Sequence, residues 1–150
     1  MKFSDGLWLN QRGFDVSYAV QAYDVTTTKN SIKIFATSSA IWNRAMTLGG
    51  VAFEITYTAV APDMIRVHIC HKGGLQNKPQ FELNLPEGYV PDDIHEEDGF
   101  VSMTAGHTTL KIKKGTDGWD VSFSRDGKRL TGGGWRSTSY IQENKFHRDA

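Results

Sequence analysis

Strict alternation of apolar and polar residues in the middle of the chain is the feature that most constrains the fold. Residues 51–58 read VAFEITYT and residues 64–70 read MIRVHIC, so that every second side chain is apolar. Successive side chains of a strand point to opposite faces, and alternation therefore predicts half-buried strands. Ala61-Pro62-Asp63 supplies a turn between them. The two segments are predicted to form an antiparallel hairpin.

The same pattern recurs along the rest of the chain. Predicted strand pairs are 18–26 with 31–37, 100–104 with 108–113, and 119–123 with 129–131. Asp126-Gly127 is the strongest turn signal, because glycine adopts a positive φ at little cost. One short helix is predicted at 40–48, and residues 73–98 are expected to be irregular and to cross from one sheet to another. Many short strands with frequent turns indicate an all-β fold, either a sandwich or a barrel.

Length and charge limit the function. A chain of 150 residues is expected to form one domain, residues 1–150. Lys and Arg number 17, as do Asp and Glu, so there is no basic excess for a nucleic-acid partner. No apolar run approaches the roughly 20 residues of a membrane span. The lone cysteine, Cys70, and a start without the apolar core of a secretion signal favour a cytoplasmic location.

Two groups of residues resemble metal ligands at first inspection. In His68, Cys70 and His71, the first two share a strand face and the third points away, which favours ordinary strand residues beside a buried cysteine. The cluster at 95–98, HEED, lacks the helix of a zincin and the ligand spacing of a calcium loop. It is interpreted as a solvated acidic loop. We expect no metal and no cofactor.

No catalytic residue is predicted. The glycines at 132–134 are not followed by the Lys-Ser/Thr and helix of a phosphate-binding loop, so a flexible or bulged turn is the better interpretation. A Gly-X-Ser-X-Gly nucleophile motif is absent from the sequence. Serine, histidine and carboxylate residues are present, but their spacing assembles no catalytic pair.

The tryptophans are the weak candidates for a sugar-binding site. Trp8, Trp42 and Trp135, together with Trp119, could offer an indole face on which the C–H face of a pyranose stacks. The competing interpretation is that these large side chains fill the core, which is the commoner role of tryptophan in a domain of this size.

Several segments resemble bacterial α-xylosidases of glycoside hydrolase family 31. The most specific is the opening MKFSDGLWL, residues 1–9. The other similar segments are 66–69 with His71 and Gly73-Gly74, then 79–85, 119–123, 126–127, 130–132 and 139–142. Together they extend over nearly the whole chain.

The resemblance implies a β-sandwich of the galactose-mutarotase-like type at the N-terminus of a larger enzyme. In that family a (β/α)-barrel follows and carries the aspartate nucleophile and the aspartate acid/base of a retaining mechanism. No segment here is similar to the barrel motifs, so no catalytic residue is carried over. The chain is also shorter than the family's sandwich region, which leaves open whether the sandwich is complete.

Three functions follow as hypotheses. The first is a non-catalytic N-terminal domain of an α-xylosidase-like or α-glucosidase-like enzyme that packs on the catalytic barrel, shapes its entrance and is inactive alone. The second is a stand-alone carbohydrate-binding sandwich. The third is a lipocalin-like small-ligand barrel, for which Gly6-Leu7-Trp8 is a weak signal. A sandwich that lacks strands exposes edges, so the isolated chain is also expected to self-associate.

Overall fold

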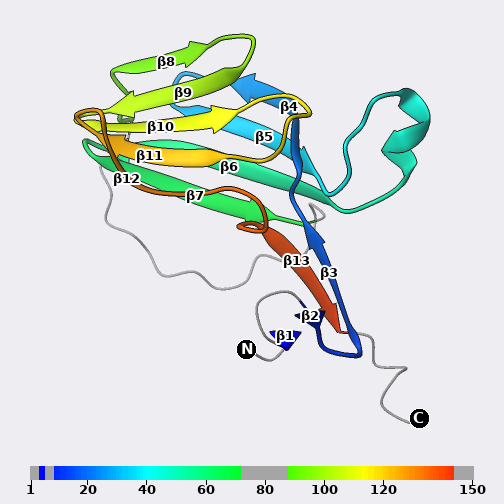
Figure 1. Ribbon diagram of the computed structural model, residues 1–150. Coiled ribbons are helices and arrows are strands. Elements are labelled where there is room, and N and C mark those ends of the chain that lie inside the picture. The colour runs from blue at the N-terminus through cyan, green and yellow to red at the C-terminus, as the bar shows by residue number, and fades with distance from the viewer. Residues whose placement is uncertain (1–3, 6–8, 72–87, 144–150) are drawn as a thin grey trace.

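Two antiparallel sheets face each other and form a sandwich (Figure 1). The computed structural model of the protein describes residues 4–5, 9–71 and 88–143. In the first sheet the order is β4 (Gln21–Thr27), β5 (Ser31–Thr37), β6 (Ala52–Ala61) and β7 (Met64–Cys70). In the second sheet the order is β12 (Lys128–Gly133), β11 (Val121–Arg125), β10 (Thr108–Lys113), β9 (Phe100–Ala105) and β8 (Asp93–Glu96). The predicted all-β antiparallel sandwich is confirmed.

The core lies between the sheets and is built from the alternation seen in the sequence. On β6, Phe53, Ile55 and Tyr57 are buried, while Glu54 between them is exposed. The inward residues of the other central strands complete one apolar cluster. They are Ile32, Ile34, Ala36, Val101, Met103, Ala105, Leu110, Ile112 and Val121. Burial in this cluster also raises the pKa of the Tyr57 hydroxyl above its ordinary value.

The predicted hairpins are present. β6 pairs with β7 around Pro62 and Asp63, β9 with β10 through Gly106, and β11 with β12 around Asp126-Gly127. Asp63 and Asp126 have φ values of 59° and 48°. Aspartate is among the few residues other than glycine that tolerate this left-handed region. The strand predicted at 119–123 begins two residues later, at Val121, so Trp119 lies in the loop before it.

A two-stranded ribbon leads away from the sandwich in Figure 1. It pairs β3 (Phe14–Tyr18) with β13 (Ser139–Glu143), antiparallel. A further small pair joins β1 (Ser4–Asp5) and β2 (Leu9–Asn10). The predicted strand at 18–26 is therefore wrong at its start. Tyr18 ends the ribbon strand, and β4 begins at Gln21 after a break where the chain enters the first sheet.

The predicted helix at 40–48 is a shorter element of another type. It is η1 (Arg44–Leu48), a 3-10 helix with Asn43 as its N-cap. The Asn43 side chain accepts a hydrogen bond from the Ala45 N–H at 3.0 Å. None of its residues is buried, so no apolar face extends it into a longer helix. The described part of the chain holds no helix with the length and apolar character of a membrane span.

The lipocalin-like barrel is wrong for this chain. Among the described residues, the two sheets keep separate strand orders and are not closed into one barrel. They approach each other at one isolated bridge, between Ala22 and Gly115. The expected crossing between sheets is confirmed, because β7 lies in the first sheet and β8 in the second. Residues 72–87 within that crossing are outside the described residues.

The turn between β6 and β7 connects the two sheets at one corner through the side chain of Asp63. The Asp63 carboxylate accepts hydrogen bonds from the His107 N–H at 2.7 Å and from the Thr108 hydroxyl at 3.2 Å, and it lies 3.3 Å from Arg125. Partial desolvation raises the pKa of Asp63. These hydrogen bonds and the positive charge of Arg125 lower it by more, so the pKa lies below its ordinary value.

Candidate functional site

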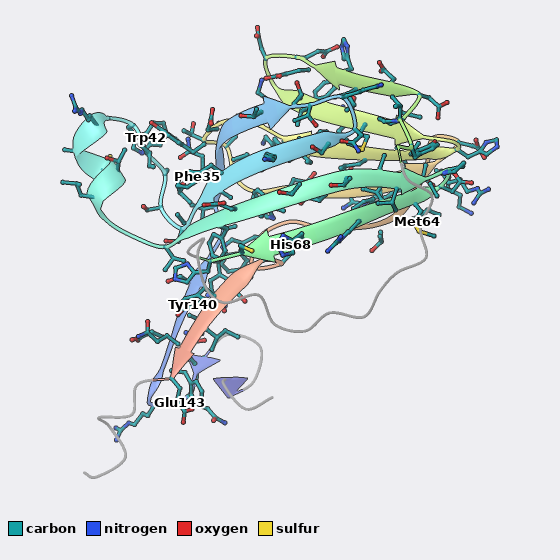
Figure 2. All side chains as sticks on the ribbon, turned by 180° about the vertical axis from the view of Figure 1, so that it is seen from behind. Phe35, Trp42, Met64, His68, Tyr140 and Glu143 are labelled. Atoms are coloured by element: carbon teal, nitrogen blue, oxygen red, sulfur yellow. The ribbon has the colours of Figure 1, made fainter. Side chains whose placement is uncertain are left out.

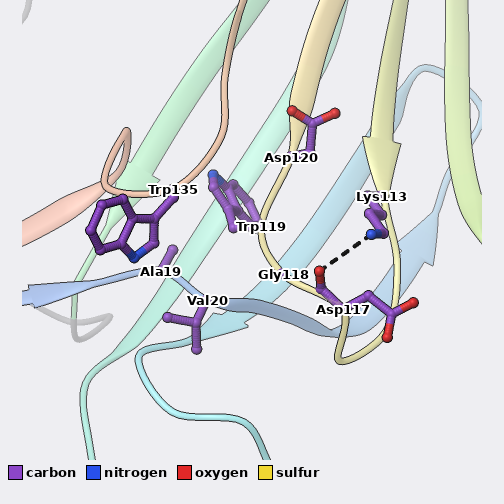
Figure 3. A pocket seen from close by; sticks show the side chains of 8 residues that line it. All are labelled: Ala19, Val20, Lys113, Asp117, Gly118, Trp119, Asp120 and Trp135. Atoms are coloured by element: carbon purple, nitrogen blue, oxygen red, sulfur yellow. Dashed lines mark hydrogen bonds between the residues drawn. The ribbon is translucent and has the colours of Figure 1, made fainter.

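A shallow hollow of about 220 Å³ opens where the ribbon joins the sandwich (Figure 3). Its lining comes from three parts of the chain: the break between β3 and β4, the loop from β10 to β11, and the loop from β12 to β13. The lining residues are Ala19, Val20, Lys113, Asp117, Gly118, Trp119, Asp120 and Trp135. The hollow therefore exists only because distant segments of the sequence meet at this point.

The loop from β10 to β11 forms one wall. It is held closed by a backbone hydrogen bond of 2.9 Å from the Lys113 N–H to the Asp120 carbonyl. The Lys113 ammonium donates a second bond of 3.3 Å to the Asp117 carbonyl. Gly118 has a φ of 109°, which other residues rarely adopt. This glycine allows the chain to turn sharply between the carboxylates of Asp117 and Asp120.

Trp119 forms the floor and belongs to the core. Its side chain is only 4% exposed and packs in the apolar cluster between the sheets. Its buried indole Nε1 has no hydrogen-bond partner among the described residues. A buried indole N–H is normally paired, since leaving a donor unpaired costs free energy. The floor of the hollow is thus an apolar ring, and the indole N–H of that ring is buried away from solvent.

Trp135 forms the rim opposite Asp117. Its side chain is 65% exposed, and Figure 3 shows its indole standing beside Trp119 and Ala19. The Arg136 guanidinium lies 4.3 Å from the Trp135 ring and 5.1 Å from the Tyr18 ring, a pair of cation–π contacts. Arg136 has a φ of 66°. The rim tryptophan is therefore positioned by its neighbour while much of its surface stays open.

This combination of groups suits a small polyhydroxylated ligand. The exposed indole of Trp135 offers an apolar face. Lys113 donates, and the carboxylates of Asp117 and Asp120 accept hydrogen bonds. Ligand sites commonly combine an apolar surface with a few placed polar groups, but they are usually larger than this hollow.

The structure separates the tryptophan candidates. Trp135 and Trp119 meet at the hollow. Trp42 is 69% exposed in the segment before η1 and does not line it. Trp8 lies outside the described residues. Sequence reasoning missed Lys113, Asp117 and Asp120, and the only signal for them was their closeness in sequence to Trp119.

The structure separates His71 from the pair His68 and Cys70, as the sequence predicted. The Cys70 Sγ atom lies 3.5 Å from the His68 Nε2 atom on the outer face of β7. The His71 ring instead lies 3.1 Å from the Ala52 carbonyl and contacts the Tyr140 ring. The expectation of a buried cysteine is wrong: Cys70 is partly exposed, because it lies on the outer face of an edge strand. Within the described ranges, no three His, Cys, Asp or Glu side chains converge on a possible metal position.

The acidic cluster at 95–98 is exposed to solvent as predicted, but only its second half lies in a loop. His95 and Glu96 end strand β8, and Glu97 and Asp98 follow in the turn toward β9. The Lys114 ammonium lies 2.7 Å from the Glu96 carboxylate and donates to the Glu97 carbonyl at 2.9 Å. His95 contacts Glu97 at 2.9 Å. These groups are satisfied by partners from their own sheet.

The glycines at 132–134 also differ from the expected turn. Gly132 and Gly133 belong to β12 and pair with Ser122 and Val121 of β11. A Cβ atom on Gly132 would overlap the Val121 carbonyl oxygen. The glycines therefore let two strands approach closely, and the register shift of this pair lies further along, between Phe123 and Ser124.

Comparison with known proteins confirms the resemblance to α-xylosidases. The chain is 26% identical over 131 residues to the α-xylosidase XylQ of Lactiplantibacillus pentosus, a match that covers 87% of this chain and 17% of that protein. It is 26% identical over 151 aligned positions to an α-xylosidase of Emericella nidulans, covering 96% of this chain and 19% of that protein. No protein-family model matches the chain. The chain thus spans less than a fifth of the length of either relative.

Proposed function

We propose that residues 1–150 are the non-catalytic N-terminal β-sandwich domain of a retaining α-glycosidase of the α-xylosidase type. The observation that carries the proposal is the likeness to two α-xylosidases, which extends over most of this chain but over less than a fifth of each relative. The sandwich packs on a catalytic barrel elsewhere in such an enzyme and shapes the entrance to its active site. The partner is the catalytic barrel, and the substrate class is an α-glycoside.

Two measurements test this assignment. The purified chain is assayed with an aryl α-xyloside and an aryl α-glucoside, and we expect no turnover. The coding sequence is then read past codon 150, and we expect a barrel with a pair of aspartates. Turnover by the chain alone would contradict the non-catalytic role. A stop codon directly after Ala150 would contradict the barrel partner. The cytoplasmic location favoured by the lone Cys70 stays a prediction, tested by fractionating the source cells.

A second candidate function is carbohydrate binding by the sandwich itself. The specific observation in its favour is the hollow between Trp119 and Trp135, with its apolar floor and its exposed aromatic rim. A pyranose would stack its C–H face on Trp135 and place hydroxyl groups near Lys113 and the carboxylates of the wall. Weak binding, in the millimolar range, is expected because the hollow is shallow.

The exposed tryptophans provide a matched pair of variants for this test. Xylose and xylo- or gluco-oligosaccharides are titrated while ligand NMR signals are followed by saturation transfer. Trp135→Ala should abolish the transfer, whereas Trp42→Ala, which removes an equally exposed indole away from the hollow, should leave it unchanged. Equal signals in both variants, or none with the unmodified chain, would contradict sugar binding at the hollow.

A further inference from the structure

The four outer edges of the two sheets are protected to different degrees. Strand β8 carries Asp93 and Glu96, β12 carries Lys128 and Arg129, and the register of β4 against β5 is shifted near Ala22. Charges and bulges of this kind discourage another chain from pairing with an edge. Strand β7 reads MIRVHIC and has one formally charged residue, Arg66; the register shift in its pair with β6 lies between Ala59 and Ala61, on the inner strand β6 and not on β7. In the described part of the chain it is the least protected edge.

The inward face of β7 is apolar and incompletely covered. Ile65, Val67 and Ile69 pair with Ala59, Tyr57 and Ile55 of β6, so their side chains point to the core side of the sheet. Val67 nevertheless remains 43% exposed and Ile69 49% exposed. The paired residues of β6 are all nearly fully buried. Among the described residues, the apolar layer therefore continues to the edge strand β7, while the side chains that cover this layer extend only as far as β6.

The sequence of β7 is complementary to itself in the antiparallel direction. A two-fold axis through Val67 places Val67 opposite Val67 of a second copy and Ile65 opposite Ile69. On the outer face it places Arg66 opposite His68 and Met64 opposite Cys70. Apolar residues thus face apolar residues, and no two carboxylates or two permanently positive groups oppose each other. Cross-strand pairs of this kind stabilise an antiparallel sheet.

We propose that two copies of this chain associate edge to edge through β7, antiparallel about a two-fold axis at Val67. The two four-stranded sheets join into one continuous sheet, and the exposed inner residues of each β7 contact those of the other. An isologous two-fold contact closes on itself, so the product is a dimer and not a fibre. Figure 2 shows β7 at the margin of its sheet, with Met64 and His68 labelled along it. This inference does not depend on the proposed glycosidase role.

Directed cross-linking tests the register. Met64→Cys places a new thiol opposite the native Cys70 of the second copy, and the two are joined by oxidation or by a short bis-maleimide. Residues 64 and 70 of one strand lie about 20 Å apart, so the bond cannot form within one chain. We expect two chains joined by two links, seen as a dimer on a non-reducing gel. Thr58→Cys, one strand further in, is the control and should not cross-link.

A second pair of variants tests the edge without new thiols. Val67→Lys puts a charge on the inward face and sets two lysines opposite each other, which should raise the dimer dissociation constant at least tenfold. Leu130→Lys, at a residue that is 58% exposed on the edge strand β12 of the second sheet, should change it by less than twofold. Both are measured by sedimentation equilibrium, with circular dichroism to confirm that each variant is folded.

Three outcomes would overturn the proposal. One is a monomer at all concentrations, as when another part of the polypeptide covers β7. Another is equal cross-linking by Met64→Cys and Thr58→Cys. The third is equal weakening by the two lysine variants, which would indicate association through no specific edge. Concentration-dependent dimers that cross-link only through residues 64 and 70 and are weakened only by the lysine at 67 support it.

Discussion

The sandwich and the ribbon are built from the same kind of strand but are stabilised differently. Inward residues of β5, β6, β9 and β10 are almost completely buried. In the ribbon of β3 and β13, no residue is buried, and Ile141 is 36% exposed. An isolated two-stranded ribbon is only marginally stable in water. The sandwich therefore has a buried core of its own, whereas the stability of the ribbon depends on the end at which it joins the sandwich.

The ribbon is joined to the sandwich at its near end. The Ala19 N–H donates to the Thr138 carbonyl at 2.9 Å, which adds a rung to the ribbon, and the Val20 N–H donates to the Thr37 carbonyl of β5 at 2.9 Å, which joins the ribbon to the first sheet. The Tyr140 ring lies 3.9 Å from the His71 ring, and Tyr140 packs against the core cluster. Figure 2 shows Tyr140 near the sandwich and Glu143 toward the far end of the ribbon. Stability should therefore fall along the ribbon away from the body.

The largest effect that tests this comparison is the loss of a core ring. Phe53→Ala should lower the free energy of unfolding by about 3–5 kcal/mol, because it removes a fully buried aromatic side chain and leaves a cavity. Ile141→Ala in the ribbon should cost less than about 1 kcal/mol, since it removes only an exposed cross-strand partner of Val16. Urea unfolding of both variants provides the measurement.

Equal losses of unfolding free energy in the two variants would contradict this difference between the sandwich and the ribbon. They would show that the ribbon unfolds together with the core as one cooperative unit. A further readout is amide hydrogen exchange, where β3 and β13 should lose protection before β6 and β10 do.

An intermediate effect is expected where the sandwich turns into the ribbon. Gly132→Ala should destabilise the chain by about 1–3 kcal/mol, because the new methyl group overlaps the Val121 carbonyl and forces β11 and β12 apart. Gly134→Ala, two residues on, is the matched control. Its Cβ would lie 3.7 Å from the Asp120 carboxylate, an ordinary contact. The midpoints of thermal unfolding of the two variants should differ clearly. Equal midpoints would show that β12 accommodates the new methyl group at position 132 without loss of stability.

The contrast between the two regions also explains what the sequence could predict. The hairpins of the sandwich join neighbouring segments, and their signals are local: alternation, then Pro62-Asp63 or Asp126-Gly127. The ribbon pairs residues 14–18 with residues 139–143, which lie at opposite ends of the chain. Residues 14–18, FDVSY, do alternate, but no turn connects them to residues 139–143, so nothing local indicates their partner. Its partner strands could not be found from local pattern.

The candidate site was predictable only in part for the same reason. An exposed, rigid aromatic such as Trp135 is a candidate in any sequence. Lys113 and Asp117 become candidates only when the loop from β10 to β11 closes beside Ala19. That closure depends on a long-range bridge between Ala22 and Gly115. Which edge is left unprotected also depends on strand order, and residue spacing does not reveal strand order.

The smallest expected effect concerns the corner at Asp63 and is lost in acid. The pKa of Asp63 lies below its ordinary value of 3.8, so its contribution to stability is fully present above about pH 4 and is lost as pH falls through the lowered pKa. Asp63→Asn keeps an acceptor oxygen and tolerates the positive φ. The variant should be less stable than the unmodified chain at pH 7, and the difference should shrink below pH 4.

The matched control for this corner is Asp24→Asn on the exposed face of β4, whose stability should follow that of the unmodified chain at every pH. Unfolding in urea between pH 2.5 and pH 7 measures all three chains. A difference at Asp63 that persists undiminished into acid would mean that side-chain shape, and not the charge-assisted contact with His107 and Arg125, fastens the corner. The corner would then resemble the ribbon joint, which depends on ring packing and one backbone hydrogen bond.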